Sequence, residues 1–351
     1  MSEALSFTLS GVAVSTVPLR ILDEMCEHFV EHAEVERNGD FAFMRSKAGT
    51  ATLELEDGEI RIELACPSQA ALQNIRTSIA EHMFYFAGED PFELSWSQAP
   101  VRGGLPNLRE AQVVRAEDVT PFMRRVWFTC GDVTPYVDGD MHVRLVIPPR
   151  GREPVWPGFR EDGRIAWPQG EDALVARAYT IRAIDRERGE LCIDFVQHPA
   201  PGVHTPGADF ARDAKAGDRV ALLGPGSGHL PAANSILLIG DESALPAIAR
   251  IAEEVPAGTQ LRAIIEIRDA AEEQALATKG TLDLRWLHRH SYPADASKVL
   301  FETAREAIEQ TDPATFVWVA CEKEDVRAIR SLLKKRGHDR KNMYAAWYWE
   351  R

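Results

Sequence analysis

The sequence has 351 residues, of which 45% are apolar and 27% charged, and its formal net charge is −14. This length exceeds one ordinary hydrophobic core and predicts two or three domains. The charge argues against nucleic acid or an anionic membrane as the main partner, and no apolar run approaches the roughly 20 residues that cross a bilayer. The N-terminus lacks signal-peptide features, and the five cysteines form no CxxC pair. A cytoplasmic protein without a disulfide framework or a metal site is expected.

Residues 1–97 are predicted to form a small α+β domain of unknown function. Apolar residues at helical spacing predict a helix over residues 19–36. Three alternating segments predict strands at 41–45, 50–56 and 59–65, and Asp57-Gly58 is a strong hairpin signal between the last two. A second helix is expected from residue 68.

The pattern of short strands in residues 98–230 predicts a small antiparallel β-barrel. A Pro/Gly-rich linker at 98–110 precedes six short strands, separated mostly by turn residues and interrupted by one short helix at 206–214. The long Pro/Gly-rich insert at 150–172 is expected to be a loop at the barrel mouth.

In residues 231–351 the predicted strands alternate with helices. The strands are expected at 235–240, 260–267, 282–288 and 315–321, with a possible final strand at 343–349. A short helix is expected at 270–276. Such alternation predicts right-handed crossovers and a doubly wound parallel sheet.

The stretch "RAYTIR" at 177–182 carries the first chemical signal. In an extended strand, Arg177 and Tyr179 point to one face and Thr180 to the other. The arginine can bind an anion, the aromatic ring can stack on a flat ring, and the hydroxyl can form one hydrogen bond. This combination suits a dinucleotide-like cofactor.

Two turns are candidate anion sites. In the strand-to-helix turn at 237–246, Gly240 allows a tight turn, Ser243 can cap the helix and Pro246 fits its first turn. GxGxxG is absent, so an ordinary strand-to-helix turn is an equal alternative. The helix start at Pro206, Gly207 and Ala208 also allows close approach of a pyrophosphate, and a simple connection is the alternative there.

Six motifs in series resemble the siderophore-interacting protein family of the ferredoxin reductase-like flavoproteins. They are "RAYT" at 177, "DFVQH" at 194, "TPGADFA" at 205, "GDESALPAI" at 240, "WVACE" at 318 and "WYWER" at 347. Their order and spacing agree over residues 111–351. Residues 1 to about 95 resemble a small domain of unknown function that is sometimes fused ahead of this family.

The resemblance implies a set of FAD-binding residues. Arg177 would bind flavin phosphate, Tyr179 would stack on the isoalloxazine and Thr180 would hydrogen-bond near its N5. The remainder of FAD would be held by His198, Thr205, Pro206, Gly207 and Ala208, and the nicotinamide side would be lined by Asp241 and Ser243. The chain departs from the family pattern at Thr205, Phe210, Ser243 and Cys321, where the family carries Gly, Trp, Thr and Gly.

The implied activity is FAD-dependent reduction of a ferric siderophore by NADPH or NADH, which releases iron(II). Alternatives are a siderophore-binding protein with a vestigial flavin site and a flavin reductase that feeds another acceptor. Arg268 suits a 2′-phosphate and favours NADPH, although an exposed surface arginine is the commoner reading. Arg144 is a candidate contact for an anionic ferric complex, and a solvated barrel arginine is the equal alternative.

Overall fold

A computed structural model describes residues 7–30, 33–100, 104–137, 140–197, 202, 204–293 and 298–350. The chain divides into two compact units. Unit 1 comprises Met1–Leu108 and Pro149–Leu174, and unit 2 comprises Arg109–Pro148 and Val175–Arg351. No helix among the described residues combines the length and apolar character needed to span a membrane.

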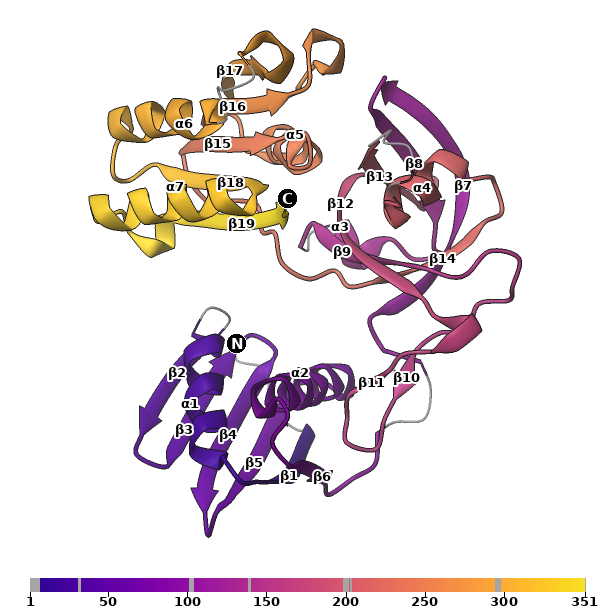
Figure 1. Ribbon diagram of the computed structural model, residues 1–351, viewed down its shortest axis with the longest axis vertical. Coiled ribbons are helices and arrows are strands. Elements are labelled where there is room, and N and C mark those ends of the chain that lie inside the picture. The colour runs from indigo at the N-terminus through magenta and orange to yellow at the C-terminus, as the bar shows by residue number, and fades with distance from the viewer. Residues whose placement is uncertain are drawn as a thin grey trace. The chain divides into compact units, whose positions relative to one another are not determined.

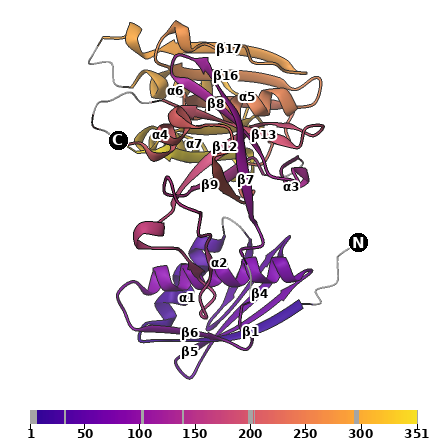
Figure 2. The same cartoon turned by 90° about the vertical axis from the view of Figure 1, so that its right-hand side faces the viewer.

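Unit 1 contains a six-stranded antiparallel sheet with two helices on one face (Figures 1 and 2). The sheet order is β2-β3-β4-β5-β1-β6. The helices are α1 (Pro18–Phe29) and α2 (Gln69–Ala87), and the strands are β1 (Phe7–Ser15), β2 (Glu34–Asn38), β3 (Phe41–Ser46), β4 (Gly49–Glu56), β5 (Glu59–Cys66) and β6 (Phe92–Trp96). Alternate residues of the strands pack against the helices in one core that includes Ile21, Leu53, Ile62 and Ile79.

The α+β class is confirmed here, but three strands were missed. β1 and β6 lie outside the predicted pattern, and β2 lies partly within the helix predicted for 19–36. The helix ends at Phe29, because the charged segment Glu34–Asn38 pairs with β3 as a hairpin. In β1 the inward residues include Gly11 and Ala13, whose small side chains give a weak alternation signal.

The insert does not behave as a free loop, because its tip packs on the N-terminal domain. It contains a short hairpin of β10 (Gly158–Phe159) and β11 (Ile165–Ala166). The Trp96 indole donates to the Asp162 carbonyl at 2.8 Å and the Thr77 hydroxyl to the Gly163 carbonyl at 2.9 Å. The barrel-mouth expectation is therefore corrected: residues 149–174 are part of unit 1.

Gly163 is the tightest point of this contact. Its φ is +90°, and a Cβ there would lie 3.0 Å from Nε of the buried Arg76. Gly163→Ala is expected to lower the free energy of unfolding by about 1–3 kcal/mol. The matched control is Gly151→Ala, since Gly151 has a φ of +74° but open space around it. Urea denaturation of both variants measures the loss in free energy of unfolding, and the difference between them is the cost of the steric clash. Equal losses in the two variants would contradict the packing of Gly163 against Arg76.

Unit 2 begins with a closed barrel in the order β12-β13-β8-β7-β14-β9. Its elements are β7 (Leu108–Thr120), β8 (Met123–Thr129), α3 (Thr134–Val137), β9 (His142–Ile147), β12 (Val175–Asp185), β13 (Glu190–Val196), α4 (Pro206–Asp213) and β14 (Arg219–Leu223). Inward side chains such as Phe128, Leu145 and Ile193 fill its interior. The predicted barrel of six strands is confirmed.

The rest of unit 2 is a five-stranded parallel sheet in the order β17-β16-β15-β18-β19. Its elements are β15 (Ser235–Asp241), α5 (Leu245–Glu254), β16 (Gln260–Ile267), β17 (Thr281–His288), α6 (Val299–Gln310), β18 (Phe316–Glu322), α7 (Lys323–Arg336) and β19 (Met343–Trp349). One core packs the sheet against α5 and the other against α6 and α7. The helix predicted for 270–276 is wrong, because only the short 3-10 helix η2 (Ala270–Glu272) forms there.

Arg250 of α5 ties the parallel sheet to the barrel. Its side chain is 2% exposed, and its guanidinium donates to the Ile181 carbonyl at 2.9 Å and to the Tyr136 carbonyl at 3.2 Å. On the same side, Arg182 of β12 pairs with Glu253 at 2.7 Å. These contacts hold the second half of β12 beside α5, and so place the "RAYT" residues close to the turn after β15.

Candidate functional site

The "RAYT" residues lie on the first half of β12, which pairs with β9. Arg177 is exposed, and its guanidinium donates only to the adjacent Ala176 carbonyl at 2.9 Å among the described residues. The Tyr179 ring is partly buried against Phe195 at 4.5 Å, and burial raises the pKa of its hydroxyl to about 12. Thr180, 5% exposed, points to the opposite face.

The start of α4 lies directly against Tyr179. A Cβ added to Gly207 would stand 1.6 Å from the Tyr179 hydroxyl oxygen, so only glycine permits this approach. Thr205 is the N-cap residue and makes no side-chain capping bond, and Pro206 begins the helix. The free N–H groups of a first helical turn attract anions. Tyr179 and α4 therefore bring together a ring surface and an anion-binding backbone.

Thr180 lies next to an aromatic hydrogen-bond cluster. Its Oγ1 is 3.3 Å from Nδ1 of His142 on β9, and the Nε2 of that histidine is 2.9 Å from the Tyr348 hydroxyl on β19. Burial lowers the pKa of His142 to about 4. The tyrosine also hydrogen-bonds to Tyr344, and its pKa is raised well above the usual value by burial. The C-terminal strand thus reaches the barrel.

Asp241 ends β15 and Ser243 lies in the turn that follows, where the strand order of the sheet reverses. Asp241 is 2% exposed and accepts a 2.5 Å bond from the Ser243 hydroxyl and a 2.7 Å bond from the Trp349 indole. Burial, reinforced by Glu242, raises the pKa of Asp241 to about 6. The predicted cap is corrected: the Ser243 hydroxyl serves Asp241, and α5 has no side-chain cap.

Cys321, at the end of β18, is a core residue. It is fully buried in the core that packs the sheet against α6 and α7. Burial is the main cause that raises the pKa of its thiol. Its place in the core favours a structural role for this cysteine.

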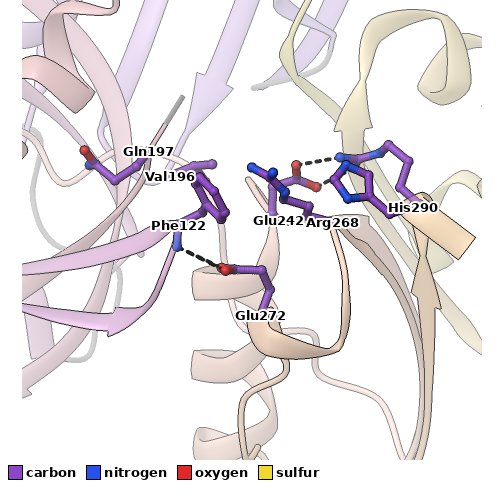
Figure 3. Close-up of a pocket in the computed structure, with 8 residues that line it drawn as sticks. Phe122, Val196, Gln197, Glu242, Arg268, Glu272 and His290 are labelled. Atoms are coloured by element: carbon purple, nitrogen blue, oxygen red, sulfur yellow. Dashed lines mark hydrogen bonds and ion pairs between the residues drawn. The ribbon is translucent and has the colours of Figure 1, made fainter. Parts of the chain in front are cut away.

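A pocket of about 210 Å³ lies at the ends of β15, β16 and β17 (Figure 3). Arg289 pairs with Glu242 at 2.6 Å and with Glu266 at 2.9 Å, so its charge is balanced. The Arg268 guanidinium carbon stands 3.9 Å from the centroid of the Phe122 ring, and its Nε is 3.6 Å from Asp269. The side chains of Arg268 and Asp269 are both about 40% exposed. The positive charge of Arg268 is therefore less compensated than that of Arg289, the other arginine of this pocket.

Arg144 is exposed on β9 and lies opposite Ala178, within the "RAYT" stretch. Within the described part of the chain no carboxylate pairs with it. Its neighbours Val143 and Leu145 pack in the barrel core. His198 lies outside the described residues.

These residues fit an FAD molecule. The Tyr179 ring packed on Gly207 at the start of α4, the exposed Arg177 and the Thr180 hydroxyl all belong to the first half of β12 or to its direct contacts. His142, Tyr348 and Trp349 belong to the same place but were not among the predicted site residues. The aromatic run at 347–349 was the available signal, and its partners on other elements were not readable from the sequence.

Three domain families match the chain. Residues 11–97 match a family described as an uncharacterized protein conserved in bacteria, residues 112–229 the siderophore-interacting FAD-binding domain, and residues 233–351 the siderophore-interacting protein.

Named relatives agree with these matches. The ferric vibriobactin reductase ViuB of Vibrio cholerae is 30% identical over 68% of this chain and 88% of its own. The NADPH-dependent ferric-chelate reductase of Escherichia coli is 29% identical, over 71% of this chain and 95% of its own. The crystal structure of a siderophore utilization protein from T. fusca is 35% identical, covers 70% of this chain and 93% of its own, and has a TM-score of 0.59.

Proposed function

Because this chain belongs to the siderophore-interacting protein family, we propose that it is an FAD-dependent NAD(P)H oxidoreductase that reduces ferric siderophores and releases iron(II) in the cytoplasm. The observation that carries this proposal is the packing of Tyr179 on the α4 start, together with the hydrogen bonds that link Thr180 through His142 to Tyr348 of β19, next to Trp349 on Asp241. Held by these residues, FAD would supply the chemistry that converts a two-electron donor into single-electron transfer to iron(III). Hard oxygen chelators hold iron(II) more weakly, so the metal is released.

The residues of this chain position the reactants. Arg177 and the N–H groups of Gly207 and Ala208, next to Thr205 and Pro206, bind the FAD phosphates. Tyr179 supplies a ring surface and Thr180 a hydroxyl for the flavin. Asp241 and Ser243 border the nicotinamide, with Trp349 holding the Asp241 carboxylate in place. No side chain is assigned as a catalytic acid or base for the electron transfer itself.

The test uses the purified full-length protein reconstituted with FAD. Anaerobic NADPH or NADH is expected to bleach the flavin spectrum, and iron(III) tris(acetohydroxamate) is expected to restore it as a ferrous chelator traps iron(II). A protein that binds no FAD would refute the proposal. Bleaching without iron reduction would favour a reductase for another acceptor, and ferric-complex binding without any bleaching a siderophore-binding protein.

The proposed substrate contact is Arg144. With a net charge of −14, attraction of an anionic ferric complex requires a local cation, and Arg144 is an exposed one beside the "RAYT" stretch. Arg144→Ala is expected to weaken binding of anionic iron(III) tris(catecholate) by about 1–3 kcal/mol. The neutral tris(acetohydroxamate) is the control. Equal losses for both complexes, or loss of FAD, would return Arg144 to a solvated surface role.

The proposed selector of the nicotinamide is Arg268. It lines the pocket near the end of the second strand in chain order, where the adenosine ribose is read in such sheets. Arg268→Ala is expected to raise the KM for NADPH about tenfold and to leave that for NADH within about twofold. Arg262→Ala, which changes an arginine within β16, is the control. Steady-state kinetics with both nicotinamides decide, and unchanged KM values would reject the assignment.

A further inference from the structure

Two histidines of the N-terminal domain stand side by side, although they come from different helices. His28 lies in the last turn of α1 and His82 in the second half of α2. Their ring centroids are 4.4 Å apart, and the ring planes are inclined by 35°. Both side chains are half-buried. The residues proposed to bind FAD, the nicotinamide and the ferric complex all belong to unit 2, so this pair has no part in that site.

The hydrogen bond of His82 determines which of its nitrogens can bind a ligand. Nδ1 lies 2.7 Å from the Ser78 carbonyl oxygen. A carbonyl can only accept, so Nδ1 carries the proton and Nε2 of the neutral ring carries the lone pair. Histidines that bind metals are typically held in this way, with one nitrogen on the ion and the other donating to a backbone carbonyl or a carboxylate.

The two helices hold the imidazoles on a rigid support. α1 and α2 lie on the same face of the sheet (Figures 1 and 2). Both pack into one core, to which α1 contributes Ile21 and Met25 and α2 contributes Ile79 and Met83. The helices cannot shift without opening this core. The separation of the two rings is therefore set by the fold, and a ligand that used both would pay little for ordering them.

Apolar rings surround the pair. The Phe29 ring stands edge-on to both imidazoles, at 5.3 Å from His28 and 5.1 Å from His82. The Phe86 ring lies 5.9 Å from His28 and 6.1 Å from His82. A hydrophobic shell of this kind limits the access of water to a metal site and so strengthens the contact between the ion and its ligands.

The ring separation suits one shared ion. A zinc-sized ion lies about 2.0–2.1 Å from each imidazole nitrogen, so two nitrogens on the same ion are at most about 4.2 Å apart. Rings with centroids 4.4 Å apart can meet this limit without a movement of either helix. Among the described residues, no group of three or more His, Cys, Asp or Glu side chains is placed to hold a metal. Two imidazoles are therefore the protein ligands on which this site depends.

We propose that His28 and His82 form a binding site for one divalent transition-metal ion, with water in the remaining coordination positions. This inference goes beyond the proposed function, because it requires neither FAD nor a nicotinamide nor a ferric complex. Imidazole nitrogen binds Ni²⁺, Cu²⁺ and Zn²⁺, whereas Mg²⁺ and Ca²⁺ take oxygen ligands. The expected affinity is highest for Cu²⁺, and Mg²⁺ is not expected to bind here.

The experiment uses the full-length protein without an affinity tag and after removal of metal with a chelator. His28→Asn, His82→Asn and the double variant remove the proposed ligands. The control is His204→Asn, at a histidine of unit 2 whose side chain is 95% exposed, because it measures adventitious binding to a surface imidazole. Calorimetric titration with Ni²⁺ measures affinity and stoichiometry. Electron paramagnetic resonance of the Cu²⁺-loaded parent protein counts the nitrogen ligands.

The parent protein is expected to bind one Ni²⁺ per chain, and either single variant is expected to bind it about 100-fold more weakly. The double variant is expected to be about as weak as either single variant, because the ion needs both imidazoles at once. His204→Asn is expected to bind like the parent. The Cu²⁺ spectrum of the parent is expected to show splitting from two imidazole nitrogens, a result that does not depend on the folding of any variant.

Three outcomes would overturn the site. They are a parent protein that binds Ni²⁺ no more tightly than the double variant, an equal loss in His204→Asn, and a Cu²⁺ spectrum with a single nitrogen ligand. Each of them would leave His28 and His82 as a packing contact between α1 and α2. Failure of the protein to bind FAD or to reduce iron would refute the proposed function and leave the metal titrations unchanged, so the two failures are distinguishable.

Discussion

Gly207→Ala is expected to lower the affinity for FAD by about 100-fold, which corresponds to about 3 kcal/mol. The new methyl group would stand 1.6 Å from the Tyr179 hydroxyl oxygen and 2.7 Å from the ring carbon that bears it. Tyr179 cannot yield easily, because its ring packs against Phe195 at 4.5 Å. Either the ring turns out of its position or α4 withdraws, and both remove a part of the proposed FAD site.

Fluorescence titration of the apoprotein with FAD measures this effect. Gly226→Ala is the matched control, because Gly226 lies in the same unit with open space around its Cα and no positive φ. Adding Tyr179→Phe to Gly207→Ala is expected to recover only part of the affinity, since the ring carbon at 2.7 Å remains too close. An alanine variant that binds FAD as tightly as the parent protein would contradict the proposed role of this helix start.

Periodicity predicted the barrel because its short strands are bounded by turn residues. It predicted the parallel sheet because strands and helices alternate along that part of the chain. It failed in the N-terminal domain, where Gly11 and Ala13 supply no strong alternation in β1. It also failed at Ala270–Glu272, where the Asp269 side chain caps only a single turn by accepting from the Ala271 N–H. Short elements contain too few residues for a period to be measured.

The candidate site was predictable only where one segment carries several functional groups. "RAYT" and the α4 start are local, so their residue types were readable in series. His142 and Tyr348 are separated by 206 positions, and neither has a local pattern that distinguishes it from a core residue. The same holds for Trp349, which became part of the site only because β19 lies beside β18 and brings its indole to Asp241.

The stability of unit 2 is expected to fall by about 3 kcal/mol between pH 4 and pH 7 through Asp241 alone. Its pKa is raised from 3.8 to about 6 in the folded protein, chiefly by burial and secondly by Glu242. The folded state therefore binds a proton more tightly than the unfolded state over this range. Its contribution is fully present below pH 4, is lost as the pH rises through 6 and is constant above.

Asp241→Asn removes this titration, so the difference in free energy of unfolding between parent and variant is expected to decline across that window. Urea denaturation at a series of pH values measures it. Trp349→Phe provides the directional control: the indole donates to the carboxylate and so lowers its pKa, and its loss is expected to raise the pKa and move the window to higher pH. If the difference in free energy of unfolding between parent and variant stayed constant from pH 4 to pH 7, Asp241 would be ionised throughout this range. The hydrogen bonds from Ser243 and Trp349 would then fully compensate the cost of burying its charge.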